Sequence, residues 1–262
     1  MERTGHKGIL ALIFAALLVL DLWLVVTGRI QPFDDSLLGF FYSIRDSFLT
    51  TVFKGITFVG NSNTMIVICI LLICLPGRMK VGLPVGLMTA VGWGAQTIYK
   101  NIVARQRPDS AYWLIEMGEN ELYQSFPSGH ANCGMILWVA LAILIGRLLI
   151  MNGNRPAAVL LRIIFVSFAF LIGVSRLYLG VHYPSDVFGG WLLAGVLLII
   201  CFALYDRFWP IKWRVALDIP EWDSIPKNAG KKRGWRKPKK RRVPAKMISF
   251  PKKRKPWKFP NP

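Results

Sequence analysis

The chain has 262 residues, of which 53% are hydrophobic, and a mean hydropathy of +0.42. This composition excludes an ordinary soluble globular domain and predicts a protein that lies in a lipid bilayer. The formal net charge of +19 is unevenly distributed, because residues 212–262 hold 18 of the 33 Lys and Arg residues. A nearly neutral apolar body is therefore followed by a strongly basic C-terminal region.

Six stretches of the body are apolar enough to cross a bilayer, which takes roughly 20 helical residues at about 1.5 Å each. In chain order they are 8–27, 51–75, 81–102, 131–150, 159–178 and 187–209. Only helices satisfy their own backbone hydrogen bonds in hydrocarbon, so we predict an all-α fold with six transmembrane helices. The first stretch is too long for a secretory signal and lacks a small-residue cleavage site, so it should stay as an anchor.

The positions of the cations between these stretches predict the orientation of the bundle. Lys and Arg residues precede the first stretch, join the second to the third and the fourth to the fifth, and dominate the C-terminal region. The positive-inside rule places all of these segments, and both termini, on the cytoplasmic side of the cell membrane. Residues 33–58 mix charges with aromatics, which is typical of short helices lying at the outer interface.

The basic region, residues 212–262, is a second predicted unit beside a membrane domain of residues 1–211. From Lys227 onward it is rich in Lys, Arg and Pro and poor in aliphatic residues, so we predict a disordered tail. Its expected partners are anionic lipids of the cytoplasmic leaflet. Nucleic acid is a rival polyanion, and a third interpretation is that the tail only stays solvated and enforces topology.

Three of the outward segments are dense in polar residues. They are Lys100 with Arg107-Pro108, then Pro127-Ser128-Gly129-His130, then Ser175-Arg176 with His182 and Asp186. All three lie at helix ends on one side of the predicted bundle, so the fold can gather them without placing a charge at the bilayer centre. We therefore predict a single polar site at the outer face of the membrane.

The cations of this predicted site match a phosphoryl group. Lys100, Arg107 and Arg176 supply many donors and three positive charges for the phosphate oxygens and for the charge that develops during transfer. Ser128 and Gly129 directly precede the fourth predicted helix, where backbone N–H groups can bind an anion. The substrate should therefore carry a phosphate.

The two histidines supply the predicted chemistry. His182 and Asp186 are four residues apart, a spacing that places both on one face of a helical turn, so Asp186 can orient the ring while His182 attacks phosphorus. His130 can protonate the leaving oxygen and later activate the water that cleaves the phosphohistidine. No metal or cofactor is needed, and the three nearby cations disfavour a metal at the His-x3-Asp pair.

These motifs resemble the three signatures of the type-2 phosphatidic acid phosphatase family. Lys100-x6-Arg107-Pro108, Pro127-Ser128-Gly129-His130 and Ser175-Arg176-x5-His182-x3-Asp186 contain every signature position. Within that family, the chain resembles the bacterial phosphatidylglycerophosphate phosphatase B branch. The resemblance implies metal-independent dephosphorylation of lipid phosphates at the outer face, with the residue roles inferred above.

Two functions are compatible with the sequence. The first is a lipid phosphatase acting on phosphatidylglycerophosphate, phosphatidate or undecaprenyl diphosphate. The alternative is a protein that binds or moves a lipid phosphate without hydrolysing it, with the basic tail as an interaction module.

Overall fold

The computed structural model describes residues 2–116, 122, 124–210 and 215. Its helices are α1 (Glu2–Val26), α2 (Gln31–Ser43), α3 (Ser47–Val59), α4 (Ser62–Cys74), α5 (Gly82–Val103), the short 3-10 helix η1 (Ser110–Tyr112), α6 (Gly129–Met151), α7 (Arg155–Tyr178) and α8 (Pro184–Phe208). All regular structure in these residues is helical, which confirms the predicted all-α class.

The chain divides into two units, Met1–Asp218 and Ile219–Pro262, and every helix of the described residues belongs to the first. Of the predicted tail, residues 212–262, only Val215 is described. The predicted disorder and the predicted boundary after residue 211 therefore concern residues that lie outside the described part of the chain.

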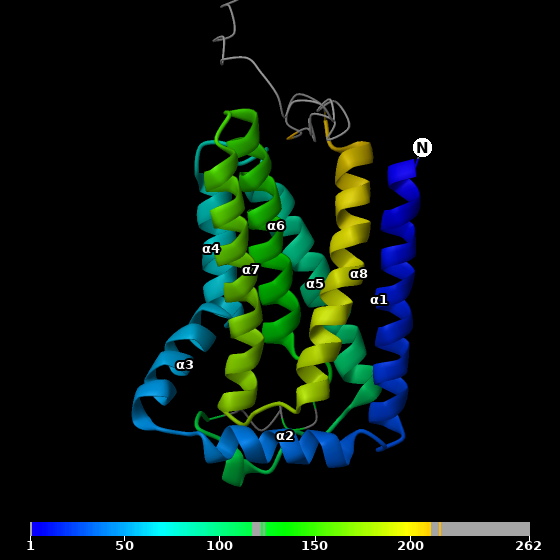
Figure 1. The fold of residues 1–262 in the computed structure, drawn as a ribbon, viewed down its shortest axis with the longest axis vertical. Helices are drawn as coiled ribbons and strands as arrows, with labels where there is room; N and C mark the ends of the chain where they lie inside the picture. The colour runs from blue at the N-terminus through cyan, green and yellow to red at the C-terminus, as the bar shows by residue number, and fades with distance from the viewer. Residues whose placement is uncertain (1, 117–121, 123, 211–214, 216–262) are drawn as a thin grey trace, which may run out of the picture. The chain divides into compact units, whose positions relative to one another are not determined.

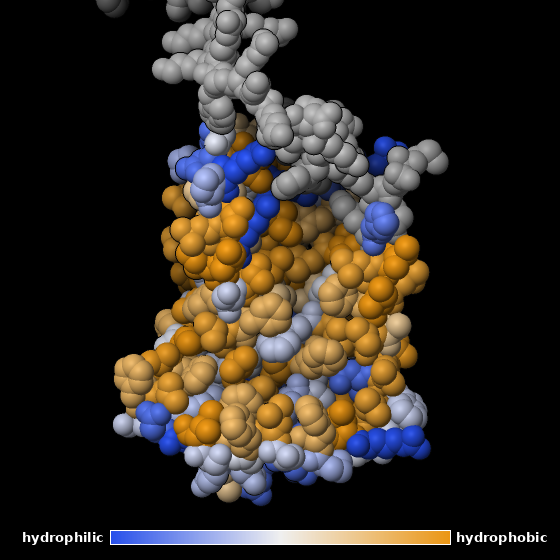
Figure 2. Space-filling model, in the orientation of Figure 1, coloured by the Kyte–Doolittle hydropathy of each residue, from blue (hydrophilic) through white to orange (hydrophobic). Residues whose placement is uncertain are grey.

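Four helices of the described chain are long and apolar enough to cross a membrane. They are α1 over Gly8–Val26, α6, α7 and α8, and the bent pair α3 and α4 is a fifth candidate. Figure 2 shows an apolar band over the middle of the visible face of the first unit, with hydrophilic residues toward its ends. These features define a multi-pass membrane protein.

The predicted count of six spans stays a prediction. The third predicted span corresponds to α5, which has 22 residues but is not among the helices that pass as spans by length and hydropathy. Its glycines, Thr89, Gln96 and Lys100 lower its mean hydropathy. Because α5 packs against α4, α6 and α8, neighbouring helices rather than lipid cover part of its surface.

The prediction of one continuous helix over residues 51–75 is wrong. The helix α3 ends at Val59, α4 begins at Ser62, and their axes differ by 51°. Asn61 caps α4, since its side-chain oxygen accepts a hydrogen bond from the backbone N–H of Asn63 at 3.1 Å. Asn is strongly preferred at such a cap, so α4 starts at Asn61, one residue after Gly60 caps the end of α3.

The central helix of the bundle is α6, which packs against α5, α7 and α8, while α1 packs along α8. The helix α2 runs crosswise at one end of the bundle, the end where α7 stops and α6 and α8 start (Figure 1). The buried side of α2 carries Asp34 and Leu38, and its other side exposes Phe33 and Phe40. This crosswise course agrees with the helix predicted at the outer interface, and its contact with lipid stays a prediction.

The break between α3 and α4 generates a stability prediction. A Cβ at Gly60 would lie 2.5 Å from Ile172 Cγ2 and 3.0 Å from His130 Cδ2. The Gly60→Ala change should lower stability by about 1–3 kcal/mol, the usual range for overpacking, and should lower the melting temperature in detergent. Gly55→Ala in α3 is the matched control, since nothing lies within 4 Å of its Cβ position. Equal melting temperatures for the two variants would contradict this account of the break.

Candidate active site

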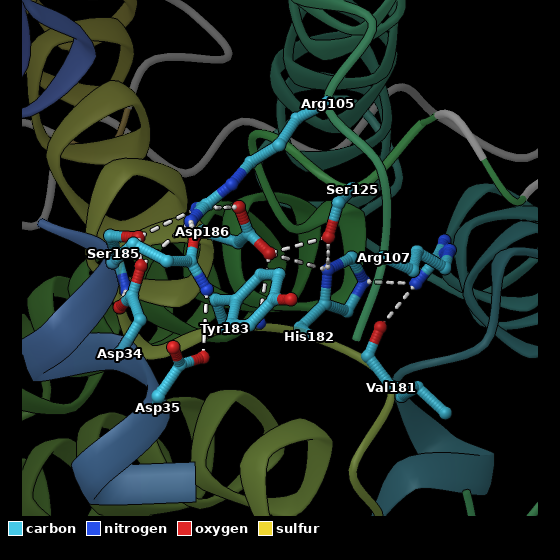
Figure 3. A network of polar contacts seen from close by, with 11 residues as sticks. Asp34, Asp35, Arg105, Arg107, Ser125, Val181, His182, Tyr183, Ser185 and Asp186 are labelled. Carbon is cyan, nitrogen blue, oxygen red and sulfur yellow. Dashed lines mark hydrogen bonds and ion pairs between the residues drawn. The ribbon is translucent and has the colours of Figure 1, made fainter. Parts of the chain in front are cut away.

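The segments that hold the predicted motifs meet at the end of the bundle crossed by α2. Figure 3 shows Arg107, Ser125, His182 and Asp186 pointing toward one another from the segment after α5, the segment before α6 and the turn between α7 and α8. Three of these four residues were predicted from the motifs. Ser125 was not.

His182 is 1% exposed and contacts Arg107 through one ring nitrogen. Arg107 Nη1 lies 2.9 Å from His182 Nε2 and also donates to the carbonyl oxygen of Val181 at 2.7 Å. A guanidinium group has only donors, so Nε2 is an acceptor in this contact. Nε2 therefore carries a lone pair, and the proton of the neutral ring lies on Nδ1.

Asp186 lies on the opposite side of the His182 ring and is 0% exposed. Its Oδ2 is 3.5 Å from His182 Nδ1, and it accepts from Ser125 Oγ at 2.5 Å and from the Tyr183 backbone N–H at 2.8 Å. His182 precedes the first residue of α8, Pro184. The predicted pairing is thus achieved by the turn that starts α8, not by a shared helical face.

Arg105 completes the surroundings of Asp186 and ties them to α2. Its guanidinium donates to Asp186 Oδ1 and to Asp34 Oδ2, both at 2.7 Å. Asp34 also accepts from the backbone N–H of Ser185 at 2.9 Å. Burial opposes the charge of Arg105, but Asp186 and Asp34 outweigh it and raise the pKa of Arg105 above its ordinary value. Two buried carboxylates thus share one arginine.

The predicted cations surround the two histidines. Arg107 and Arg176 are 5% and 3% exposed. Burial, followed by the positive charges of Arg107, Arg176 and Lys100, lowers the pKa of His182 well below its ordinary value of 6.5. His130 lies within electrostatic range of the same three cations and of His182. A ring that favours its neutral form and a strongly positive field therefore occur together.

The helix α3 contributes to this site through Thr57 and the following glycine. Arg176 Nη1 donates to Thr57 Oγ1 at 2.7 Å, and Thr57 is buried. Gly60 leaves room for the ring of His130, because a Cβ at Gly60 would lie only 3.0 Å from His130 Cδ2. The break that the sequence did not predict is therefore what brings α3 against Arg176 and His130.

Ser128 and Gly129 occupy the start of α6, as predicted. The backbone N–H of Ser128 donates to the carbonyl oxygen of Asp186 at 2.8 Å, so this N–H is already used. The Ser128 hydroxyl is buried and has no hydrogen-bond partner among the described residues. A Cβ at Gly129 would lie 2.8 Å from Gln96 Oε1, so any larger residue here would have to displace the end of the Gln96 side chain. The hydroxyl is the group of Ser128 that can bind an anion.

Cavities adjoin the site on two sides. A polar cavity of about 440 Å³ is lined by Gln31, Arg105, Arg107, Asp109 and Tyr183, among others. An apolar cavity of about 400 Å³ lies between α1, α2 and α8 and is lined by residues that include Leu24, Phe33, Leu177, Val187 and Trp191. Within the described residues, no group of three or more His, Cys, Asp and Glu side chains is placed to hold a metal ion.

Sequence reasoning missed three polar residues that contact the predicted ones, Thr57, Arg105 and Ser125, and it missed Asp34, which contacts Arg105. Arg105 and Ser125 lie within a few residues of the motifs, so a wider window around each motif would have included them. Asp34 and Thr57 lie far from the motifs in sequence, and no local pattern marks them.

A buried histidine with a carboxylate on one side and cations on the other, at the end of a membrane bundle, defines a membrane protein with a phosphoryl-transfer type of site. Residues 81–210 match the family model described as PAP2 superfamily. This matched range contains all eight predicted site residues. Residues 81–210 therefore form a PAP2 superfamily domain, which confirms the resemblance of the motifs, and the protein is a hydrolase of the phosphatase class.

Two curated relatives and one solved structure illustrate this membership. The chain is 29% identical over 185 residues to phosphatidylglycerophosphatase B of Bacillus subtilis, covering 69% of this chain and 87% of that protein. It is 30% identical over 137 residues to lipid A 1-phosphatase of Rhizobium etli, covering 47% and 53%. The crystal structure of a transmembrane PAP2 type phosphatidylglycerolphosphate phosphatase from Bacillus subtilis matches with a TM-score of 0.67 at 24% identity, covering 76% of this chain and 97% of that one, which shows the fold.

The surroundings of His182 generate a spectroscopic prediction. Because its pKa is depressed, the ring should stay neutral as the pH falls through 6.5, with the proton on Nδ1 and none on Nε2. The chain contains only three histidines, so ¹⁵N-histidine NMR in detergent can resolve this ring, with His182→Gln assigning its signals. A fully protonated imidazolium at pH 6.5, or a neutral ring protonated on Nε2, would contradict the geometry.

Proposed function

We propose that the chain is a membrane lipid-phosphate phosphatase that works through a phosphohistidine formed on His182. The observation that carries this proposal is the buried His182 ring, with Arg107 at Nε2 and with Ser125 and Asp186 at Nδ1. An imidazole held in one tautomer, with its lone pair directed toward cations, is arranged to attack an electrophile that carries negative oxygens.

The reaction follows from the positions of the charged groups. Lys100, Arg107 and Arg176 bind the phosphoryl oxygens, together with the hydroxyl of Ser128 and the start of α6 at Gly129. The Nε2 lone pair of the nucleophilic histidine forms the N–P bond while the ester P–O bond breaks, and His130 donates a proton to the leaving oxygen. Water, deprotonated by His130, then attacks phosphorus, which breaks the N–P bond and releases phosphate.

Arg107 changes partner at the start of this sequence. In the free protein its guanidinium donates to His182 Nε2, the atom proposed to attack. A phosphate dianion is a stronger acceptor than a neutral imidazole, so a bound phosphoryl group draws the donor to its own oxygens. The same event binds the substrate and frees the nucleophile.

The lipid character of the substrate is supported by the relatives and by the apolar cavity. The names of two relatives, phosphatidylglycerophosphatase B and lipid A 1-phosphatase, both refer to lipid phosphates. The apolar cavity is lined by Leu177, Pro184 and Val187, which flank the turn that holds His182, so a hydrocarbon chain can lie beside the head group. Phosphatidylglycerophosphate, phosphatidate and undecaprenyl diphosphate are the proposed substrates.

We also propose that the site faces away from the cytoplasm and that six segments cross the cell membrane. The start of α1, the end of α8 and the connections after α4 and α6 lie at one end of the first unit, opposite α2 (Figure 1). The cations Arg78, Lys80 and Arg155 lie in or beside those connections. The positive-inside rule therefore supports a cytoplasmic position for that end. Anionic lipids are the proposed partner of the basic tail.

Removal of the proposed nucleophile tests the function. His182→Ala should lower phosphate release from a lipid phosphate in detergent with EDTA by at least about 10⁴-fold, because no other group replaces the lone pair. Truncation before Lys227 should leave turnover largely intact. A rapid alkaline quench of the wild type with ³²P-labelled substrate should trap an acid-labile label on histidine. If truncation abolished turnover and His182→Ala did not, the hydrolytic proposal would be wrong. Comparing the turnover of the wild type on the three proposed substrates ranks those substrates.

The contact from α3 generates a second test of substrate binding. Thr57→Val removes an acceptor of Arg176 while keeping the shape of the side chain, so Arg176 loses part of its preorganisation. We expect KM for the lipid phosphate to rise by about tenfold, with a smaller change in kcat. The matched control is Thr51→Val in the same helix, whose hydroxyl bonds only to Ser47 O of α3. Equal KM values for the two variants would exclude a role for α3 in phosphate binding.

A further inference from the structure

Ser125 lies between His182 and Asp186 and belongs to none of the predicted site positions. It is 0% exposed and precedes α6 by four residues. Its Oγ lies 2.5 Å from Asp186 Oδ2 and 3.3 Å from His182 Nδ1. Figure 3 shows this hydroxyl with dashed contacts to both side chains. The question is what a hydroxyl does in that position.

The direction of the hydrogen bonds follows from the donors and acceptors present. Arg107 can only donate, so His182 Nε2 accepts and the ring proton lies on Nδ1. An ionised carboxylate can only accept, so the single hydroxyl proton of Ser125 goes to Asp186 Oδ2. The oxygen of Ser125 is then left to accept the hydrogen bond from His182 Nδ1–H.

The hydroxyl is a closer partner for the ring than the carboxylate is. The direct distance from His182 Nδ1 to Asp186 Oδ2 is 3.5 Å, against 3.3 Å to Ser125 Oγ, and both are longer than the usual N–H···O range of about 2.7–3.2 Å. Asp186 Oδ2 already accepts from Ser125 and from the Tyr183 backbone, and Asp186 Oδ1 accepts from Arg105. In the free protein, Ser125 is therefore the group that connects ring and carboxylate.

We propose that Ser125 is a positioning residue of the reaction, which holds His182 in its Nδ1–H tautomer and couples the ring to the charge of Asp186. This inference rests on the proposed function. When Nε2 forms the N–P bond and the ester P–O bond breaks, the ring becomes positively charged and its Nδ1–H becomes a stronger donor. The Nδ1 proton stays on the ring, and the leaving oxygen takes its proton from His130. No proton passes through Ser125.

The experiment compares Ser125→Ala, Ser125→Thr and the control Thr89→Val. Ser125→Ala should lower kcat by about 10- to 100-fold, since a hydrogen bond to a group that becomes charged is lost. KM and the affinity for inorganic phosphate should change by less than about threefold, because the phosphate ligands are intact. Ser125→Thr, which keeps the hydroxyl, should have a kcat at least about tenfold higher than that of Ser125→Ala. Thr89→Val also removes a buried hydroxyl, but one that donates to Val85 O of its own helix and contacts none of the proposed site residues, and should behave like the wild type.

A second readout does not depend on turnover. In ¹⁵N-histidine NMR, Ser125→Ala should shift the Nδ1 signal of His182 and introduce a population protonated on Nε2, whereas Thr89→Val should not. A wild-type kcat and an unchanged Nδ1 signal in Ser125→Ala would overturn the role of Ser125 while leaving the proposed function intact. Parallel losses of phosphate affinity and of kcat would show a structural role and also overturn it. An inactive wild type with the expected NMR change would instead contradict the proposed function.

Discussion

A single buried carboxylate organises this end of the protein. Asp186 is fully buried, and a buried charge is tolerated only where donors replace the water it has lost. Those donors are the Arg105 guanidinium, the Ser125 hydroxyl and the Tyr183 backbone N–H. They come from the segment after α5, the segment before α6 and the first turn of α8, so satisfying one charge brings three segments together.

The same carboxylate links structure to the proposed chemistry. Through Ser125 it orients the ring of His182, and through Arg105 it is tied to Asp34 in the crosswise helix α2. In the proposed reaction, its negative charge stabilises the positive ring while the proton stays on Nδ1. Burial, followed by the cations on the other side of the ring, favours the neutral ring in the free protein. Opposite charges on the two sides of one imidazole thus create the polarity that the reaction needs.

The broken pair α3 and α4 shows how a membrane bundle can place polar groups at its end. A straight helix over residues 51–75 would satisfy hydropathy, yet the chain bends by 51° between α3 and α4. The bend brings the Thr57 hydroxyl against Arg176 and leaves Gly60 beside His130. Non-helical backbone is tolerated in a membrane protein where protein rather than lipid surrounds it, and here Gly60 lies beside Ile172 of α7. The break therefore belongs to the site as much as to the fold.

Local features of the sequence determined the all-helical class, the membrane location and the motif residues. Apolar length and motif spacing can be read from short segments of the sequence. Within such a segment, the backbone must satisfy its hydrogen bonds in lipid and the charges must find partners. Only the tertiary structure decided which groups meet: Asp34 with Ser185 across 151 positions, Arg105 with Asp186 across 81, and Arg176 with Thr57 across 119. Those pairings, the tautomer of His182 and the bend before α4 depend on how helices pack, and packing is a property of distant surfaces that no short window contains.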